Sequence, residues 1–216
     1  FSADYRVIGA QVRTFLLERS RVTAASNEGE RSYHALYQLV CDGTHVAPSE
    51  PSAFRYLNLS GCTTIDGVDD VKDFRENHAS LLSIGLSADE VGVLWGMVAS
   101  MLLLGNITYG TATNAEIKDM ATVAKVEEML GVTDLAELLL KRSIKVGADV
   151  TRIEHSPAQA SQARDALVKI MYARLFDYLV TRINATVDSP DTSDRYIGLL
   201  DVYGFEFFQV NSFEQL

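Results

Sequence analysis

The segment around Asp201 constrains the fold most, because an apolar run ends there in a short polar motif. Residues 196–200 (Tyr-Ile-Gly-Leu-Leu) carry no charge, which is typical of a strand buried inside a parallel sheet. Open α/β sheets bind ligands just beyond the carboxyl ends of such strands. Asp201 is therefore placed to hold Mg²⁺, directly or through water. Gly204, which lacks a Cβ, can bring its backbone N–H close to a terminal phosphate. An Asp-x-x-Gly motif alone also fits a plain turn.

Residues beyond this motif extend it into a longer pattern. The stretch from Asp201 through Glu206 to Leu216 resembles the second switch and the start of the relay helix of myosin motors. Six other stretches resemble the same family in the same order: Phe15-Leu-Leu-Glu-Arg-Ser-Arg-Val22, Glu30-Arg-Ser-Tyr-His34, Tyr56-Leu-Asn-Leu-Ser-Gly-Cys62, Leu103-Leu-Gly-Asn106, Asp165-Ala-Leu-Val-Lys169 and Leu175-Phe-Asp-Tyr-Leu-Val-Thr-Arg-Ile-Asn184. Together they span nearly the whole chain.

The resemblance implies an actin-based motor that hydrolyses Mg-ATP by in-line attack of water on the γ-phosphate. Asp201 would orient the Mg²⁺ shell, and the Gly204 N–H would bind the γ-phosphate. Glu206 is expected to pair with an arginine of the first switch, to close the phosphate pocket and to help place the water. Such an ion pair forms in one state and breaks in another. Without the resemblance, Glu206 fits a surface glutamate at the start of a helix.

Two phosphate-binding segments of the family do not occur in this sequence. No Gly-rich loop ends in Gly-Lys-Ser or Gly-Lys-Thr, and no Ser-Arg-Phe-Gly segment marks a first switch. We therefore interpret the chain as an internal fragment of a longer motor and expect the fragment alone to be inactive as an ATPase, because a hydrolysis site must be preorganised. Two alternatives are another nucleotide switch protein, such as a GTPase or kinesin, and an actin-binding pseudo-motor without ATP turnover.

The expected fold class of the intact motor is α/β, of the P-loop NTPase type, with a mixed sheet flanked by helices. The fragment itself is expected to be mostly helical, with a few strands of the central sheet. We expect sheet strands in residues 1–25, the upper helical actin-binding subdomain in 26–187, and the second-switch strand with the start of the relay helix in 195–216. The alternation of polar and apolar residues over 11–18 predicts one of these strands.

Two capping boxes predict the principal helices. Ser87-Ala-Asp-Glu90 opens a helix with a wide apolar face that ends at Gly105-Asn106. Ser156-Pro-Ala-Gln159 opens a long, strut-like helix that runs to about residue 187. Apolar spacing also predicts helices near 33–40, over 114–130 and from 133, whereas 43–73, with its prolines and glycines, is expected to be an irregular connection.

Residues 143–153 alternate around a Gly-containing turn, which predicts a two-stranded ribbon. The resemblance identifies Asp149, in that turn and sixteen residues before Asp165, with an actin-facing position that holds an acidic residue or a phosphorylatable Ser or Thr. A fixed charge makes phosphorylation unnecessary there; an ordinary turn aspartate is the alternative. The surrounding basic residues either steer an acidic partner or form a solvated face. Lys145, Asp149 and Arg152 are the candidate actin-binding residues.

Composition narrows the classes of partner and site. The net charge of −10 argues against a nucleic-acid partner. The partner that the resemblance implies, actin, is itself acidic, so contacts with it must come from local surface features. Two cysteines make no disulfide framework, which fits a reducing compartment. The apolar part of 91–115 is too short to cross a bilayer comfortably, so we expect no transmembrane segment. The resemblance implies a cytoplasmic motor of the actin cytoskeleton, with light chains or calmodulin on a lever arm outside this sequence.

Overall fold

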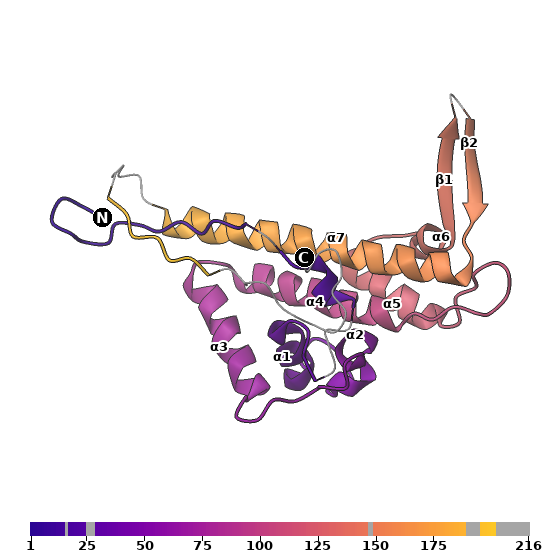
Figure 1. Cartoon of the computed structure of the whole chain (residues 1–216), viewed down its shortest axis with the longest axis horizontal. Helices are drawn as coiled ribbons and strands as arrows, with labels where there is room; N and C mark the ends of the chain where they lie inside the picture. Colours follow the sequence, from indigo (N-terminus) through magenta and orange to yellow (C-terminus); the bar gives the residue numbers. More distant parts are fainter. Residues whose placement is uncertain (16, 25–28, 147–148, 189–194, 202–216) are drawn as a thin grey trace.

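The computed structural model describes residues 1–15, 17–24, 29–146, 149–188 and 195–201, and most of its regular structure is helical. The longest helix, α7, runs along the length of the molecule, and two strands project from one end of it (Figure 1). The elements in chain order are η1 (Arg19–Val22), α1 (His34–Asp42), η2 (Pro51–Ala53), α2 (Arg55–Asn58), α3 (Asp70–Ser83), α4 (Ala88–Asn106), α5 (Met120–Leu130), α6 (Leu135–Leu140), β1 (Lys141–Val146), β2 (Asp149–Glu154) and α7 (Pro157–Val187).

Helix α4 is the centre of the core. It begins with the predicted capping box, in which the Ser87 hydroxyl accepts from the Glu90 N–H and the Glu90 carboxylate accepts from the Ser87 N–H. It packs against α1, α3, α5 and α7, and the predicted apolar face is buried: Val91, Leu94, Trp95, Val98, Met101 and Leu102.

The length of α4 corrects one expectation from the sequence. With 19 residues, α4 is long and apolar enough to cross a bilayer, although the apolar part of 91–115 was expected to be too short. However, 56% of its most apolar window is buried inside this protein. Burial against other helices, rather than length, is what identifies α4 as a core helix.

Helix α7 confirms the prediction of a long strut. The Ser156 hydroxyl accepts from the Gln159 N–H, the Gln159 side chain accepts from the Ser156 N–H, and Pro157 occupies the first helical position. The helix has 31 residues, which corresponds to about 46 Å at a rise of 1.5 Å per residue. It packs against α4 and α6, so it links the base of the strands to the opposite end of the molecule.

Three segments that are far apart in the sequence meet where α2, α4 and α7 converge. The Tyr56 hydroxyl donates to Asp165 Oδ1 at 2.6 Å. Arg164, which is only 2% exposed, pairs with the Asp165 carboxylate and donates to the Ile107 carbonyl at 2.6 Å. Burial, and next the hydrogen bond to Asp165, raise the pKa of Tyr56, so its hydroxyl stays protonated and donates. These contacts fasten α7 to α2 and to the end of α4.

Gly105 allows the Tyr56 ring to lie directly against α4. A Cβ at position 105 would lie 2.5 Å from Tyr56 Cε2 and 2.6 Å from Tyr56 Cδ2. The next residue, Asn106, accepts from the Arg55 N–H at 2.8 Å and donates to the Ala53 carbonyl at 2.9 Å. Gly105 and Asn106 therefore fix the position of α2 on α4.

Replacing Gly105 with alanine is expected to destabilise the complete protein by about 1 to 3 kcal/mol, because the added methyl must displace the Tyr56 ring. Gly96→Ala, in the same helix, is the matched control, since nothing lies within 4 Å of a Cβ there. The better helix propensity of alanine should leave that variant as stable as the parent or more stable by up to about 1 kcal/mol. Thermal unfolding compares the two, and equal midpoints would contradict the close packing at Gly105.

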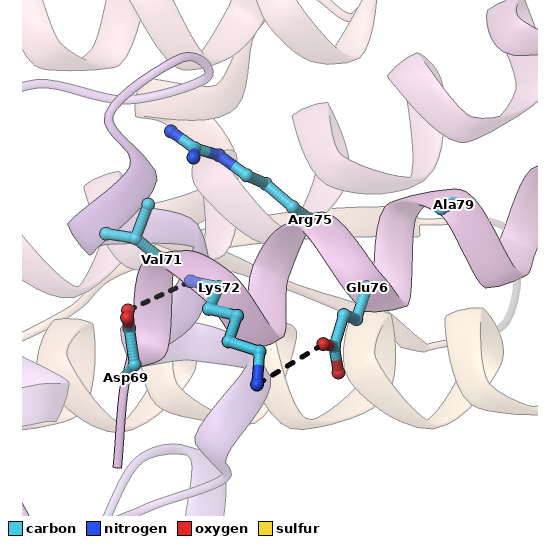
Figure 2. A pocket seen from close by; sticks show the side chains of 6 residues that line it. All are labelled: Asp69, Val71, Lys72, Arg75, Glu76 and Ala79. Carbon is cyan, nitrogen blue, oxygen red and sulfur yellow. Dashed lines mark hydrogen bonds and ion pairs between the residues drawn. The ribbon is translucent and has the colours of Figure 1, made fainter.

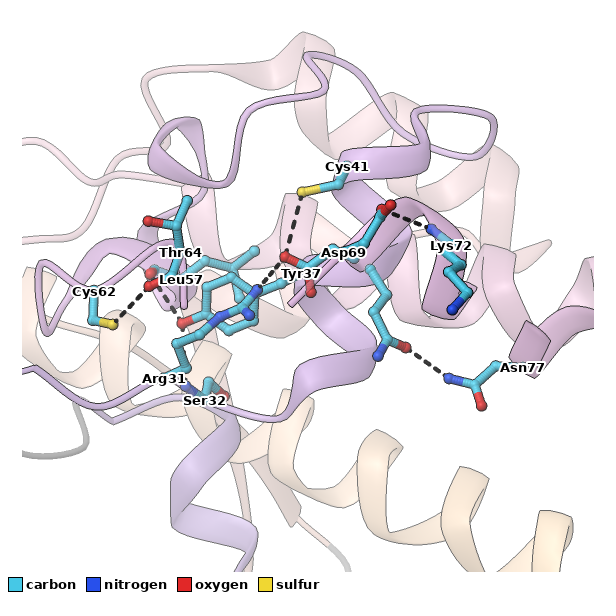
Figure 3. Close-up of polar contacts among 12 residues, drawn as sticks. Arg31, Ser32, Tyr37, Cys41, Leu57, Cys62, Thr64, Asp69, Lys72 and Asn77 are labelled. Atoms are coloured by element: carbon cyan, nitrogen blue, oxygen red, sulfur yellow. Dashed lines mark hydrogen bonds and ion pairs between the residues drawn. The ribbon is translucent and has the colours of Figure 1, made fainter. Parts of the chain in front are cut away.

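Arg31 connects α1 to α3 at a buried site (Figure 3). Its Nη2 donates to Asp70 Oδ2 at 2.8 Å, and its guanidinium carbon lies 3.8 Å from the centroid of the Tyr37 ring. The Tyr37 hydroxyl in turn accepts from the Ser32 N–H and donates to the Leu57 carbonyl. Arg31 and Ser32 belong to one of the stretches that resemble myosins, and in the structure this stretch holds helices together.

Residues 11–18 and 196–200, which were predicted to be strands of the central sheet, form no strand among the described residues. Leu199 is 95% exposed. A strand needs a neighbour to satisfy its N–H and C=O groups, and the described residues supply none for these segments. The first segment instead follows the end of α7, where the Asn184 side chain accepts from the Val12 N–H at 2.7 Å and donates to the Val12 carbonyl at 2.9 Å.

Several helix boundaries also differ from the sequence predictions. Helix α5 begins at Met120 rather than at residue 114, because the Asp119 side chain accepts from the first N–H groups and caps the helix there. The connection predicted over 43–73 contains η2, α2 and the start of α3, so it is only partly irregular. Helix α3 was not predicted; it is capped by Asp69, whose side chain accepts from the N–H of Lys72.

Candidate functional site

Strands β1 and β2 form a hairpin that projects from the helical body where α6 meets α7 (Figure 1). Six antiparallel pairs run from Lys141↔Glu154 to Val146↔Asp149, which confirms the predicted ribbon. Ile144, Val150 and Ile153 are between 37% and 60% exposed. A projecting hairpin that exposes apolar side chains among basic ones is suited to contact with another macromolecule.

Glu137 on α6 engages basic side chains at the base of the hairpin. Its carboxylate forms an ion pair with the Arg152 guanidinium and lies 4.0 Å from Lys141 Nζ. The Arg152 side chain is 63% exposed, so this pair contributes little to stability. The effect of this pair is electrostatic. Glu137 already balances part of the positive charge of the hairpin, which was predicted to attract an acidic partner.

His155 joins the hairpin to α6 and α7. The residue is buried, its Nδ1 lies 3.0 Å from the Leu139 carbonyl oxygen, and its N–H donates to the Leu140 carbonyl at 2.7 Å. Its own carbonyl accepts from the Ala115 N–H at 2.7 Å. Because α6 runs directly into β1, no later helical N–H is available to the carbonyls of Leu139 and Leu140 at the end of α6. His155 supplies partners to both.

The register divides the three residues predicted to contact actin. Lys145 is opposite Val150, and Arg152 is opposite Ser143. One other pair separates these two along the ladder, so by the alternation of a strand they belong to the same face of the hairpin. The pair of Asp149 with Val146 is next to the pair of Lys145 with Val150, so it belongs to the opposite face of the hairpin. Asp149 is also the first residue of β2 rather than a residue of the turn. The side chains of Lys145 and Asp149 lie outside the described part of the structure, so their contacts with actin stay predictions.

Sequence reasoning missed Glu137 and His155. Glu137 precedes Lys141 by four residues, and that spacing could have indicated a helical ion pair, although α6 ends just before Lys141. No signal in the sequence indicates His155, because its side chain contacts a backbone carbonyl sixteen residues earlier. Only the tertiary structure brings these groups together.

The predicted nucleotide site lies largely outside the described residues. Asp201 is exposed and follows a segment that forms no strand, and Gly204 and Glu206 fall within 202–216, which the structure does not describe. A single exposed carboxylate does fit the way in which proteins hold Mg²⁺, which binds one or two carboxylates together with waters and substrate phosphates. The roles of Asp201, Gly204 and Glu206 therefore stay predictions from the sequence.

A shallow depression on the outer face of α3 has no catalytic arrangement (Figure 2). Its lining residues are Asp69, Val71, Lys72, Arg75, Glu76 and Ala79. Asp69 accepts from the Lys72 N–H as a helix cap, and Lys72 lies 3.6 Å from Glu76 in an ordinary i, i+4 pair. We assign this depression no function.

The chain is similar to myosins over its whole length. The family described as "Myosin head (motor domain)" matches residues 1–216. The chain is 37% identical to Myosin-16 of Arabidopsis thaliana, over 97% of the chain and 18% of that protein, and 37% identical to Myosin-7 of the same plant, over 100% and 13%. It is 36% identical to Myosin-1 of Mycosarcoma maydis, over 100% and 18%. The chain thus spans less than a fifth of the length of these relatives. Because the family match extends from the first residue to the last, this chain belongs to the myosin head (motor domain) family.

Proposed function

We propose that this chain is part of an actin-based cytoskeletal motor that couples Mg-ATP hydrolysis to movement along actin filaments. The observation that carries the proposal is the match of the motor-domain family to all 216 residues. The fold agrees with it in part, since the described residues form a mostly helical unit with a projecting hairpin at one end. The motor would act in the cytoplasm on the actin cytoskeleton, with light chains or calmodulin bound to a lever arm.

The nucleotide-binding role is assigned to the end of the chain. Asp201 would hold the Mg²⁺ shell, directly or through water, and the Gly204 N–H would bind the γ-phosphate. Glu206 would close the phosphate pocket and help to place the attacking water. When bound, Mg²⁺ and ATP would supply the electrophile and its charge balance, while these residues would supply orientation and fixed electrostatics.

The actin-binding role is assigned to the hairpin, with Lys145, Asp149 and Arg152 as the contact residues. The hairpin projects from the body, so a filament can reach it without displacing the helices behind it. The chain carries a net charge of −10, and an acidic filament would repel most of its surface. Contact is therefore expected at a local feature of this kind.

Cosedimentation of the complete motor with F-actin tests the proposal. If nucleotide and actin binding are coupled, each must change the affinity for the other by the same factor. We expect the motor to pellet with actin in the absence of nucleotide and to be released by Mg-ATP. Pelleting that is identical with and without Mg-ATP would support an actin-binding pseudo-motor instead.

Asp149→Ala in the complete motor is expected to lower the actin-activated ATPase, because the proposed contact requires the carboxylate at the start of β2 to meet a local basic group of the filament, against the repulsion between the two net charges. The defect should shrink as salt rises, since a surface charge acts mostly on association and is screened. The measurement is the dependence of ATPase on actin concentration at low and moderate salt. Curves that coincide with the parent would make Asp149 an ordinary residue of the hairpin, and equal losses with and without actin would indicate misfolding.

A further inference from the structure

The orientation of the hairpin depends on a small joint at its base. Each strand has six residues, so the hairpin extends about 20 Å at 3.3 Å per residue. A rotation of about 10° at the base would then move the tip by about 3 Å, which is as long as a hydrogen bond. A projecting element of this shape contacts a partner reproducibly only if its base is held.

His155 lies at that joint and makes contacts in three directions. Its side chain and its N–H reach the carbonyls of the last turn of α6, and its C=O accepts from the N–H of Ala115. It follows the last residue of β2 and precedes Ser156, the N-cap of α7. The hairpin is therefore tied through one residue to α6, to the loop before α5 and to α7.

The side-chain contact of His155 has a defined chemistry. A carbonyl oxygen only accepts, so Nδ1 of His155 carries the proton that it donates to the Leu139 carbonyl. His155 is buried, with 9% of its surface exposed. Loss of its Nδ1–H would therefore remove a buried donor from the Leu139 carbonyl at the end of α6. The ion pair of Glu137 with Arg152 and the hydrogen bond from the Asn114 amide to the Glu154 carboxylate also tie the base of the hairpin, but both lie in solvent.

We propose that His155 is the positioning residue of the hairpin: its Nδ1–H caps the end of α6, fixes the angle of the hairpin relative to α7, and thereby sets the affinity of the hairpin for the actin filament. The last step rests on the proposed function. His155 is buried and acts through the hairpin rather than by touching the filament. Loss of the cap would spread the hairpin over several orientations, and the apparent affinity would fall in proportion to the fraction that remains competent.

Three substitutions in the complete motor separate this role from simple packing. His155→Ala removes the donor. In His155→Asn the amide nitrogen is separated from the backbone by the same number of bonds as Nδ1, so this variant keeps the donor in place. His155→Gln carries the same amide one methylene farther out and is the matched control. Thermal unfolding of all variants establishes which of them fold, and the comparison of asparagine with glutamine stands even if the alanine variant does not fold.

The first readout needs no actin. Spin labels at Ile144 on the hairpin and at Ile170 on α7, both of which are exposed, report the distance between the two elements. The labels are introduced through cysteines, after other reactive cysteines have been replaced. We expect a broader distance distribution in the alanine and glutamine variants and a parent-like distribution in the asparagine variant. An unchanged distribution in His155→Ala, or equal rescue by glutamine and asparagine, would overturn the orienting role.

The second readout is the actin concentration that half-saturates the ATPase. If between a third and a tenth of the hairpins remain competent in His155→Ala, this concentration should rise roughly threefold to tenfold, while the rate at saturating actin should stay at the parent value. In His155→Asn the half-saturating concentration should return to the parent value. A broader distance distribution with an unchanged actin dependence would overturn the link to actin. A parent motor without any actin dependence would contradict the proposed function, whereas the distance distributions would still decide whether His155 orients the hairpin.

Discussion

Replacing Gly204 with alanine in the complete motor is expected to lower the rate of Mg-ATP hydrolysis by about a hundredfold or more, the typical effect of removing one backbone or side-chain donor from a site of developing charge. The proposed role of Gly204 requires its N–H to approach the γ-phosphate, and a Cβ would obstruct that approach. Nucleotide binding should survive, because most of it is expected to come from the phosphate-binding loop that lies outside this sequence. Single-turnover hydrolysis and binding of a fluorescent ATP analogue measure the two effects separately.

Gly198→Ala is the matched control, because it adds the same methyl on the other side of Asp201 and leaves the N–H that is proposed to bind the γ-phosphate untouched. This variant should hydrolyse ATP at nearly the parent rate. A Gly204→Ala motor that stays within about twofold of the parent would show that Gly204 is only a turn residue.

Replacing Arg164 with methionine is expected to destabilise the protein by about 1 to 3 kcal/mol, because the buried Ile107 carbonyl would lose its donor, while the Asp165 side chain is 30% exposed and keeps its hydrogen bond from Tyr56. Arg164 is 2% exposed and bridges two elements, since its guanidinium pairs with Asp165 and donates to the carbonyl of Ile107. Methionine fills much of the volume but donates to neither group. The thermal unfolding midpoint of the complete motor is the measurement.

Arg174→Met makes the same substitution at an exposed position of α7, so it controls for changes in net charge and helix propensity. It should change stability by no more than about 0.5 kcal/mol. If both variants unfold at the same midpoint, the contacts of Arg164 do not hold α7 to α4 as described.

The helices could be predicted from the sequence where their signals are local. Ser87 with Glu90, and Ser156 with Gln159, form capping boxes that can be recognised within four residues, and the structure confirms both. No strand forms over 196–200 among the described residues, because a strand depends on a partner that can come from anywhere in a protein, and apolar composition alone does not supply one. The start of α5 was missed for a local reason, since the Asp119 side chain accepts from the N–H groups of Ala121 and Thr122 and begins the helix there.

The hairpin could be predicted, but not the way in which it is anchored. Alternating residues around Gly147 indicate two strands. The partners of the hairpin base, Glu137 and the carbonyls bound by His155, become neighbours only when α6, β2 and α7 meet. The same holds for Tyr56 and Asp165, which are 109 residues apart in the chain yet share a hydrogen bond. The stretches that resemble myosins thus include residues that join helices, which their sequence alone does not show.

The steady-state ATPase of the complete motor, measured against F-actin concentration, tests the central claim most directly. The proposal predicts a basal Mg-ATP turnover that rises with actin and saturates, because coupling requires the filament to change a step of the nucleotide cycle. Turnover that does not respond to actin at any concentration, or no turnover in a motor that still pellets with actin, would contradict the claim that this chain belongs to a working actin-based motor.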